Sequence, residues 1–198
     1  MTAFTKTEQK MLVHRRRNFP GRPTAAAAVT VAVLSAAPSG CSGSDQKREY
    51  TLPRSLCGTA IDTDDLANFL PPGKRITVRK KPYSGVKNCE VVVDDKLIVT
   101  TTLAWLEEGK TTAYFSAGQS LEAPEHSADA GRFRFSDSEA FGKTQDCVDR
   151  RHKQELYTAV QAQGSEHRDA DAMKRLIASF TKEIEASEAC TAGPLQGK

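Results

Sequence analysis

One apolar run, residues 25–37, most constrains what this chain can fold into. As a helix its thirteen residues would reach about 20 Å, against about 30 Å of bilayer hydrocarbon. The flank before it carries six Lys and Arg side chains and one acid. A basic flank followed by a short apolar core is typical of an export signal that is removed from the mature protein. We therefore expect residues 1–40 to be an export signal outside the folded domain.

Two short motifs bear on the export route and on an anchor. The sequence Arg16-Arg17-Asn18-Phe19 partly matches the twin-arginine motif, and the general export route is the alternative. The sequence Pro38-Ser39-Gly40-Cys41 is similar to a bacterial lipobox, in which the cysteine receives a lipid. We expect Cys41 to be lipidated and to anchor the protein to the outer face of the cell membrane. Soluble secretion is the alternative.

The cysteine count agrees with a lipid on Cys41. The chain has five cysteines, and an odd number in an exported protein requires an explanation. With Cys41 lipidated, four remain for two disulfides, and four cysteines allow three pairings. We favour Cys57–Cys89 and Cys147–Cys190, which place one disulfide in each half of the domain. Thiolate metal binding is the alternative, but no Cys-x-x-Cys is present, and an oxidising compartment favours disulfides.

Charge excludes one class of partner. The whole chain has 28 Lys and Arg and 25 Asp and Glu. The first 40 residues hold six of the basic residues and one of the acids, so residues 41–198 have 22 basic and 24 acidic residues. A nucleic-acid-binding domain needs a basic patch, and an excess of acids does not provide one. We expect no nucleic-acid partner. We expect a polar tether at 41–54 and a single extracytoplasmic domain at 55–198.

Hydrophobic periodicity predicts an α+β fold, with an antiparallel sheet packed against a long C-terminal helix. The expected strands are 76–81, 89–93, 97–105, 111–115, 132–135 and 156–162, and the expected loops are 116–131 and 137–154. The clearest helix is 169–189, whose apolar stripe follows the i, i+3, i+4, i+7, i+11 rule. Its members are Met173, Leu176, Ile177, Phe180 and Ile184.

A shorter helix is expected after Asp62, whose carboxylate suits an N-cap, and before the Pro71-Pro72-Gly73 stop. A calcium loop beginning at Asp62 is the alternative. Its spacing fails, because Ala67 stands where the turn glycine is needed and Gly73 where the bidentate glutamate is needed. We therefore expect no metal at this site.

A basic cluster, Arg79, Lys80 and Lys81, closes the first expected strand. Lysines on an edge strand prevent further strands from pairing, and we favour this structural interpretation. The alternative is a contact with anionic lipid headgroups or cell-wall polymers.

No motif for catalysis or cofactor binding is present. The expected domain has three histidines, His126, His152 and His167, all in charged surroundings and outside a His-Glu-x-x-His pattern. There is no Gly-x-Ser-x-Gly nucleophile elbow. We expect no cofactor and a non-enzymatic binding or interaction module at the cell surface. An envelope hydrolase, with a catalytic set assembled in three dimensions, is the alternative.

Several stretches resemble uncharacterised secreted lipoproteins of actinobacteria, the high-GC Gram-positive bacteria. The lipobox-like Pro38-Ser39-Gly40-Cys41 is one of them. The others are Leu56-Cys57-Gly58, Phe69-Leu70-Pro71-Pro72-Gly73, Cys89-Glu90-Val91 and Val93-Asp94-Asp95-Lys96, and the likeness covers most of residues 55–190. The resemblance implies a lipid-anchored extracytoplasmic domain; it implies no activity and no site residues.

Overall fold

The computed structural model describes residues 47–83, 86–120, 123–191 and 193, and every structural statement below concerns them. The expected export signal and Cys41 lie outside the described residues. No helix in these ranges is both long enough and apolar enough to cross a bilayer.

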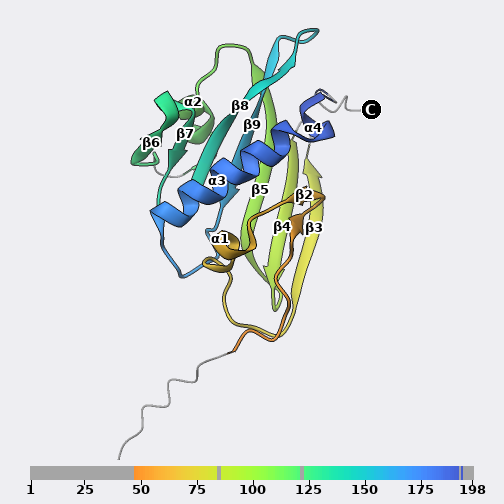
Figure 1. Ribbon diagram of the computed structural model, residues 1–198, viewed down its shortest axis with the longest axis vertical. Helices are drawn as coiled ribbons and strands as arrows, with labels where there is room; N and C mark the ends of the chain where they lie inside the picture. Colours follow the sequence, from red (N-terminus) through yellow and green to blue (C-terminus); the bar gives the residue numbers. More distant parts are fainter. Residues whose placement is uncertain (1–46, 84–85, 121–122, 192, 194–198) are drawn as a thin grey trace, which may run out of the picture. The chain divides into compact units, whose positions relative to one another are not determined.

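The centre of the fold is a seven-stranded antiparallel sheet in the order β3-β4-β5-β9-β8-β7-β6 (Figure 1). The strands are β3 (Ile76–Tyr83), β4 (Val86–Val93), β5 (Lys96–Glu107), β6 (His126–Ala128), β7 (Phe133–Phe135), β8 (Glu139–Asp149) and β9 (Gln154–Gln161). β3 is an edge strand, as predicted, and it continues through Pro82. A proline is tolerated there because its missing N–H lies on the free edge.

β4 and β5 form an antiparallel hairpin, and its turn is set by two aspartates. Asp94 and Asp95 have φ values of 46° and 68°, the left-handed conformation that two-residue hairpin turns require. The side chain of Asp94 also accepts hydrogen bonds from the backbone N–H groups of Lys74 and Arg75. Strict alternation along β5 would place Leu97 on the buried face with Val99 and Thr101. Leu97 is instead 44% exposed, because a β-bulge beside Val91 shifts the local register.

Helix α3 (Ala170–Glu185) covers one face of the sheet over β7, β8 and β9 (Figure 1). Asp169 caps it by accepting from the N–H of Ala172 at 2.9 Å. All five residues of the predicted stripe are buried. The α+β fold, with its antiparallel sheet and C-terminal helix, is therefore confirmed.

The C-terminal helix ends earlier than predicted. α3 ends at Glu185, and a separate turn, α4 (Glu188–Thr191), follows. Ser187 divides the two, because its hydroxyl donates to the carbonyl of Ile184 and accepts from the N–H of Ala189. Arg175 of α3 pairs with the chain before the sheet: its guanidinium lies 2.9 Å from the carboxylate of Asp65.

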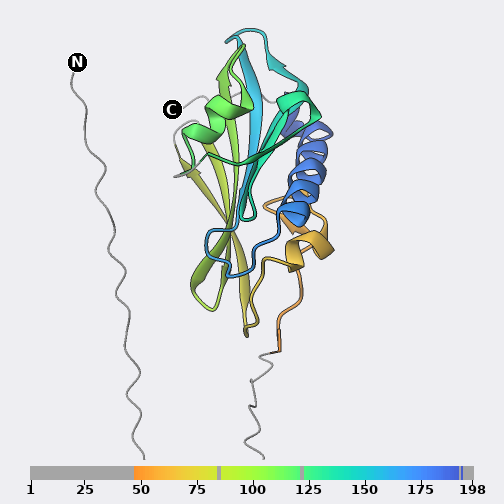
Figure 2. The same ribbon diagram turned by 90° about the vertical axis from the view of Figure 1, so that its left-hand side faces the viewer.

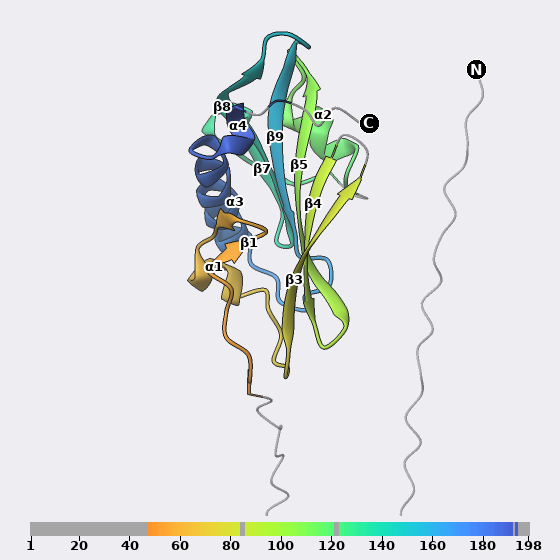
Figure 3. The same cartoon turned by 90° about the vertical axis from the view of Figure 1, so that its right-hand side faces the viewer.

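The chain before β3 lies on the same face of the sheet as α3 (Figure 3). It forms a small hairpin, β1 (Ser55–Leu56) and β2 (Thr59–Ala60), and then α1 (Thr63–Ala67). The hairpin turn holds Cys57 and Gly58 at φ values of 53° and 103°, a geometry that favours glycine. Asp62 caps α1 as predicted, accepting from the N–H groups of Asp64 and Asp65.

Part of the expected tether belongs to the folded unit. The guanidinium of Arg48 donates to the carbonyl of Ala67, the last residue of α1, and to that of Leu70 beyond it. The hydroxyl of Tyr50 donates to the carbonyl of Pro71. Leu52 packs against the core. Residues 48–52 are therefore held against α1 and the core.

The opposite face of the sheet is covered by α2 (Thr112–Ala117), for which the sequence analysis wrongly predicted a strand (Figure 2). Thr111 caps this helix by accepting from the N–H of Tyr114. Phe115 then packs edge-on against Phe141 and also contacts Tyr157, with ring centroids 5.8 and 5.4 Å away. One turn of helix can bury an aromatic side chain as well as a strand can. The short apolar pattern therefore did not distinguish a helix from a strand.

A second prediction fails at residues 137–154, which were expected to be a loop. β8 occupies most of this stretch and pairs with both β7 and β9. Its charges are accommodated across the ladder, since Lys143 lies 2.7 Å from Glu155 of β9. Ala140 and Phe141 of this strand are completely buried, and Cys147 is only 1% exposed.

Both predicted disulfides are present. Cys57 is bonded to Cys89, which joins the β1–β2 turn to β4, and Cys147 is bonded to Cys190, which joins β8 to α4.

Candidate functional site

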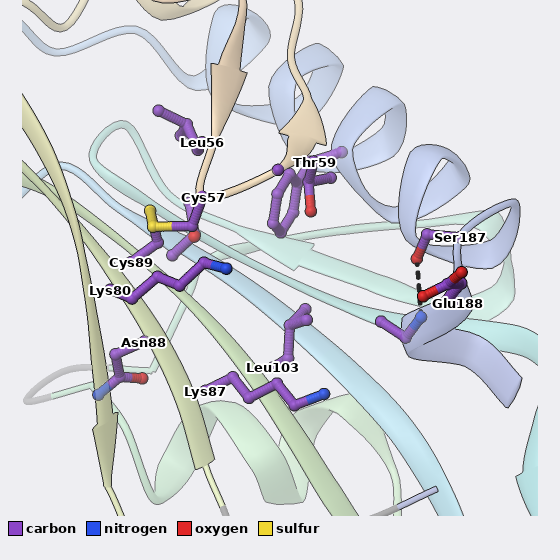
Figure 4. A pocket seen from close by; sticks show the side chains of 14 residues that line it. Leu56, Cys57, Thr59, Lys80, Lys87, Asn88, Cys89, Leu103, Ser187 and Glu188 are labelled. Atoms are coloured by element: carbon purple, nitrogen blue, oxygen red, sulfur yellow. Dashed lines mark hydrogen bonds between the residues drawn. A yellow bond between two sulfur atoms is a disulfide. The ribbon is translucent and has the colours of Figure 1, made fainter. Parts of the chain in front are cut away.

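A cavity of about 620 Å³ lies between the face of β3, β4 and β5 and the segments that cover it (Figure 4). The sheet supplies the floor, the β1–β2 hairpin one wall, and the end of α3 with α4 the other wall. α3 crosses the sheet over β7, β8 and β9, so it does not fill the space over β3–β5.

The interior of the cavity is mainly apolar, with Thr101 as a buried polar residue of the lining. Leu56 and Phe180 line it and are each only 1% exposed, so they mark its inner end. Leu103 of β5 lines the floor and is half-buried, and the Cys57–Cys89 disulfide is part of the wall. Such a lining favours a ligand with an apolar body.

Strand alternation places two lysines on the cavity side of the sheet. Lys80 is paired with Cys89, and Lys87 with Leu103, so all four side chains point to the same face. Lys80 is exposed and Lys87 half-buried, and both extend across the floor toward the α3–α4 wall (Figure 4). The two lysine side chains, which remain at least partly open to solvent, therefore lie beside the apolar part of the lining.

The carboxylate of Glu188 in α4 is the acidic group of the described lining. Among the residues that the structure describes, neither Lys80 nor Lys87 forms an ion pair, and Glu188 forms none either. The lining thus carries two positive groups and one negative group.

The structure separates the three residues of the basic cluster. Arg79 and Lys81 point to the sheet face opposite the cavity, where their cationic groups lie 2.7 and 3.3 Å from the carboxylate of Glu90. The hydrogen bond from Arg79 and the charge of Lys81 hold the pKa of Glu90 below its usual value. Arg79 and Lys81 are thus paired with Glu90, and Lys80 alone of the three lines the cavity.

Both side walls of the cavity are covalently fixed. The Cys57–Cys89 bond ties the hairpin wall to the floor, and the Cys147–Cys190 bond ties α4, with Glu188 and Ala189, to β8. The predicted disulfides therefore hold the elements that enclose the cavity.

The three histidines of the domain lie elsewhere. His126 packs against Phe135, with ring centroids 5.2 Å apart, and His167 lies edge-on to Phe69 at 6.0 Å. The Nδ1 atom of His152 is 2.6 Å from the carboxylate of Asp149, and this contact lowers the pKa of that carboxyl group. None of the three lines the cavity. Within the described ranges, no group of three or more His, Cys, Asp or Glu side chains is placed to hold a metal ion.

Sequence reasoning missed most of the cavity. Lys87, Leu103, Phe180 and Glu188 were not identified as a group, because they come from segments up to about a hundred residues apart. One signal was available. Lys87 stands two residues before Cys89, the first residue of a predicted strand, and residues at that spacing along a strand share a face.

No protein-family description, curated protein or solved structure matches this chain.

Proposed function

We propose that this protein is a cell-envelope lipoprotein whose domain is a non-enzymatic binding module, with the cavity over β3–β5 as its ligand site. The cavity itself carries the proposal. Its volume of about 620 Å³ lies within the range of about 300–1,000 Å³ for sites that enclose small molecules. Its lining is mainly apolar with a few polar groups, as such sites usually are.

The composition of the lining favours binding over hydrolysis. A hydrolase needs a nucleophile and a base within hydrogen-bond reach of each other. The described lining contains no histidine, and its one acidic side chain is Glu188. The hydroxyl of Ser187 is already engaged with the backbone at the start of α4. The envelope hydrolase remains the second class, without a specific observation in its favour.

The proposed location at the cell envelope is supported mainly by the sequence. The apolar run at 25–37, the lipobox-like motif and the odd cysteine support export and lipidation of Cys41. Two disulfides are consistent with an oxidising compartment outside the cytoplasm.

Cavity occupancy is tested with an uncharged apolar dye, 1-N-phenylnaphthylamine, whose fluorescence rises in apolar surroundings. The domain from residue 42 onward, which lacks the anchoring Cys41, is exported to an oxidising compartment and titrated with the dye. We expect saturable binding of one dye per protein. The Leu103→Trp variant fills the floor of the cavity and should lose dye binding. Thr100→Val, on the opposite face of the same strand, is the control and should keep dye binding. No dye binding by the wild type, or equal binding by the filled variant, would reject the ligand site.

The anchor is tested separately with Cys41→Ala. Membrane fractionation and metabolic lipid labelling should show that the wild type is labelled and membrane-bound and that the variant is neither. Unlabelled wild type that is retained at the membrane to the same extent as the variant would reject lipidation while leaving the cavity in place.

A further inference from the structure

The cavity changes in polarity from its inner end to its opening. Leu56 and Phe180 are almost completely buried, whereas the side chain of Lys80 is exposed and Lys87 is half-buried. A ligand that satisfies both regions must have an apolar part and a charged part. An entirely apolar ligand would cover the lysine side chains without giving their ammonium groups a partner, which is unfavourable.

The charged residues of the lining indicate which charge the polar part of the ligand should carry. Two ammonium groups extend side by side across the floor in Figure 4, and only Glu188 opposes them in the described lining. A carboxylate or phosphate between the two lysines would form charge-assisted hydrogen bonds with both. A lysine provides three donors on a flexible stem, so it can adapt to either anion.

We propose, resting on the binding function above, that the cavity takes a single-chain anionic amphiphile. Its hydrocarbon tail lies against Leu103, Phe180 and the Cys57–Cys89 disulfide. Its anionic head lies at Lys80 and Lys87. One chain suits a space of about 620 Å³ that the sheet, the hairpin and α4 bound on three sides.

Fatty acids and lipid phosphates both combine a single hydrocarbon chain with an anionic head. Calorimetric titrations with dodecanoate and with dodecyl phosphate, both below the concentrations at which they form micelles, distinguish them. Dodecyl maltoside supplies the same tail with an uncharged head, and inorganic phosphate supplies a head without a tail. We expect at least one of the anionic amphiphiles to bind one-to-one, about tenfold more tightly than the maltoside, and inorganic phosphate not to bind. The stronger anion identifies the headgroup.

Adjacent residues on β3 give a matched pair of variants. Lys80→Gln together with Lys87→Gln should reduce the affinity for the preferred anion about tenfold, to that of the maltoside. Lys81→Gln removes one charge from the next position, on the opposite face, and should leave that affinity within about twofold. Glu188→Gln removes the opposing charge and should strengthen anion binding. Added salt should weaken the binding of the anion more than that of the maltoside.

Three results would overturn the proposal. The first is equal affinity for anionic and uncharged amphiphiles. The second is an equal loss of affinity in Lys81→Gln and in the Lys80/Lys87 double variant. The third is no binding of any amphiphile by a protein that still binds the uncharged dye at Leu103; this would reject the amphiphile and leave the binding module standing. If the wild type does not bind the dye at all, the proposed binding function is rejected, and the amphiphile proposal with it.

Discussion

Arg79 lies 2.7 Å from Glu90, directly across the ladder between β3 and β4. Lys81, two residues further along β3, reaches the same carboxylate at 3.3 Å. Lys80 stands between them in the chain and points to the other face, toward the cavity. Three consecutive basic residues therefore have two distinct structural environments.

The Glu90 contact makes part of the stability depend on pH. The pKa of Glu90 in the folded state is lowered, chiefly by the hydrogen bond from Arg79, below the value of about 4.3 for an unfolded glutamate. The stabilisation is therefore complete above that value and is lost as the pH falls through the lower folded-state value. Because Arg79 and Lys81 are mostly exposed, we expect Glu90→Gln to lower the free energy of unfolding at pH 7 by about 1 kcal/mol or less.

Urea unfolding at a series of pH values measures this effect. The difference between wild type and Glu90→Gln should shrink as the pH falls below about 4.3 and through the lower folded-state pKa of Glu90. Glu108→Gln removes an exposed carboxylate that forms no ion pair among the described residues and should change nothing. A difference that grows on acidification would contradict the assigned direction of the pKa.

The Cys57–Cys89 disulfide should support both stability and binding. Replacing both cysteines with serine should reduce the free energy of unfolding by about 2–5 kcal/mol, as loss of native disulfides in small secreted domains does. The β1–β2 hairpin, freed from β4, should lose hydrogen-exchange protection before the sheet does. Dye titration at a temperature where the variant is still folded should show weaker binding. Unchanged exchange in the hairpin would mean that its other contacts hold the wall.

The Cys147–Cys190 disulfide should act on the opposite wall. The Cys147→Ser/Cys190→Ser variant should lose stability in the same range of about 2–5 kcal/mol. Its loss of protection should centre on α4, where the N–H of Cys190 donates to the carbonyl of Ser187. If this variant melts like the wild type, the apolar stripe of α3 alone holds the C-terminal helix.

Gly164 packs closely against the backbone of β5. A Cβ atom there would lie 1.9 Å from the carbonyl oxygen of Leu97 and 2.7 Å from the Cα atom of Ile98. Gly164→Ala should therefore force the backbone apart and cost about 2 kcal/mol or more in thermal unfolding. Gly118→Ala, which brings a Cβ atom no closer than 3.6 Å to a neighbour, should change the stability by about 0.5 kcal/mol or less. Equal melting of the two variants would show that the Leu97 backbone yields easily.

Periodicity predicted the elements whose burial is one-sided. The stripe from Met173 to Ile184 is buried as expected, because helix α3 packs through one face only. The Asp94-Asp95 turn was recognisable because its residues tolerate the left-handed conformation. The errors came where tertiary contacts outweighed local pattern. β8 is a strand because β7 and β9 pair with it on both sides, and its charges find partners that the local sequence does not reveal.

The site was less predictable than the fold. Lys80 was identified as a possible anion contact, together with Arg79 and Lys81, but alternation along β3 had not been used to separate them. Phe180 was assigned to the packed stripe, and it does pack on the core while also lining the cavity. The cavity itself depends on where α3 crosses the sheet, and no residue pattern specifies that position.

The two disulfides also set an order of events for the protein. Both walls of the cavity, the β1–β2 hairpin and α4, are joined to the sheet by bonds that form in an oxidising compartment and are rare in a reducing one. Before oxidation the chain holds neither wall covalently in place. Under the proposed function, the cavity therefore holds no ligand while the newly made chain is in the cytoplasm. It binds its ligand only after export across the membrane.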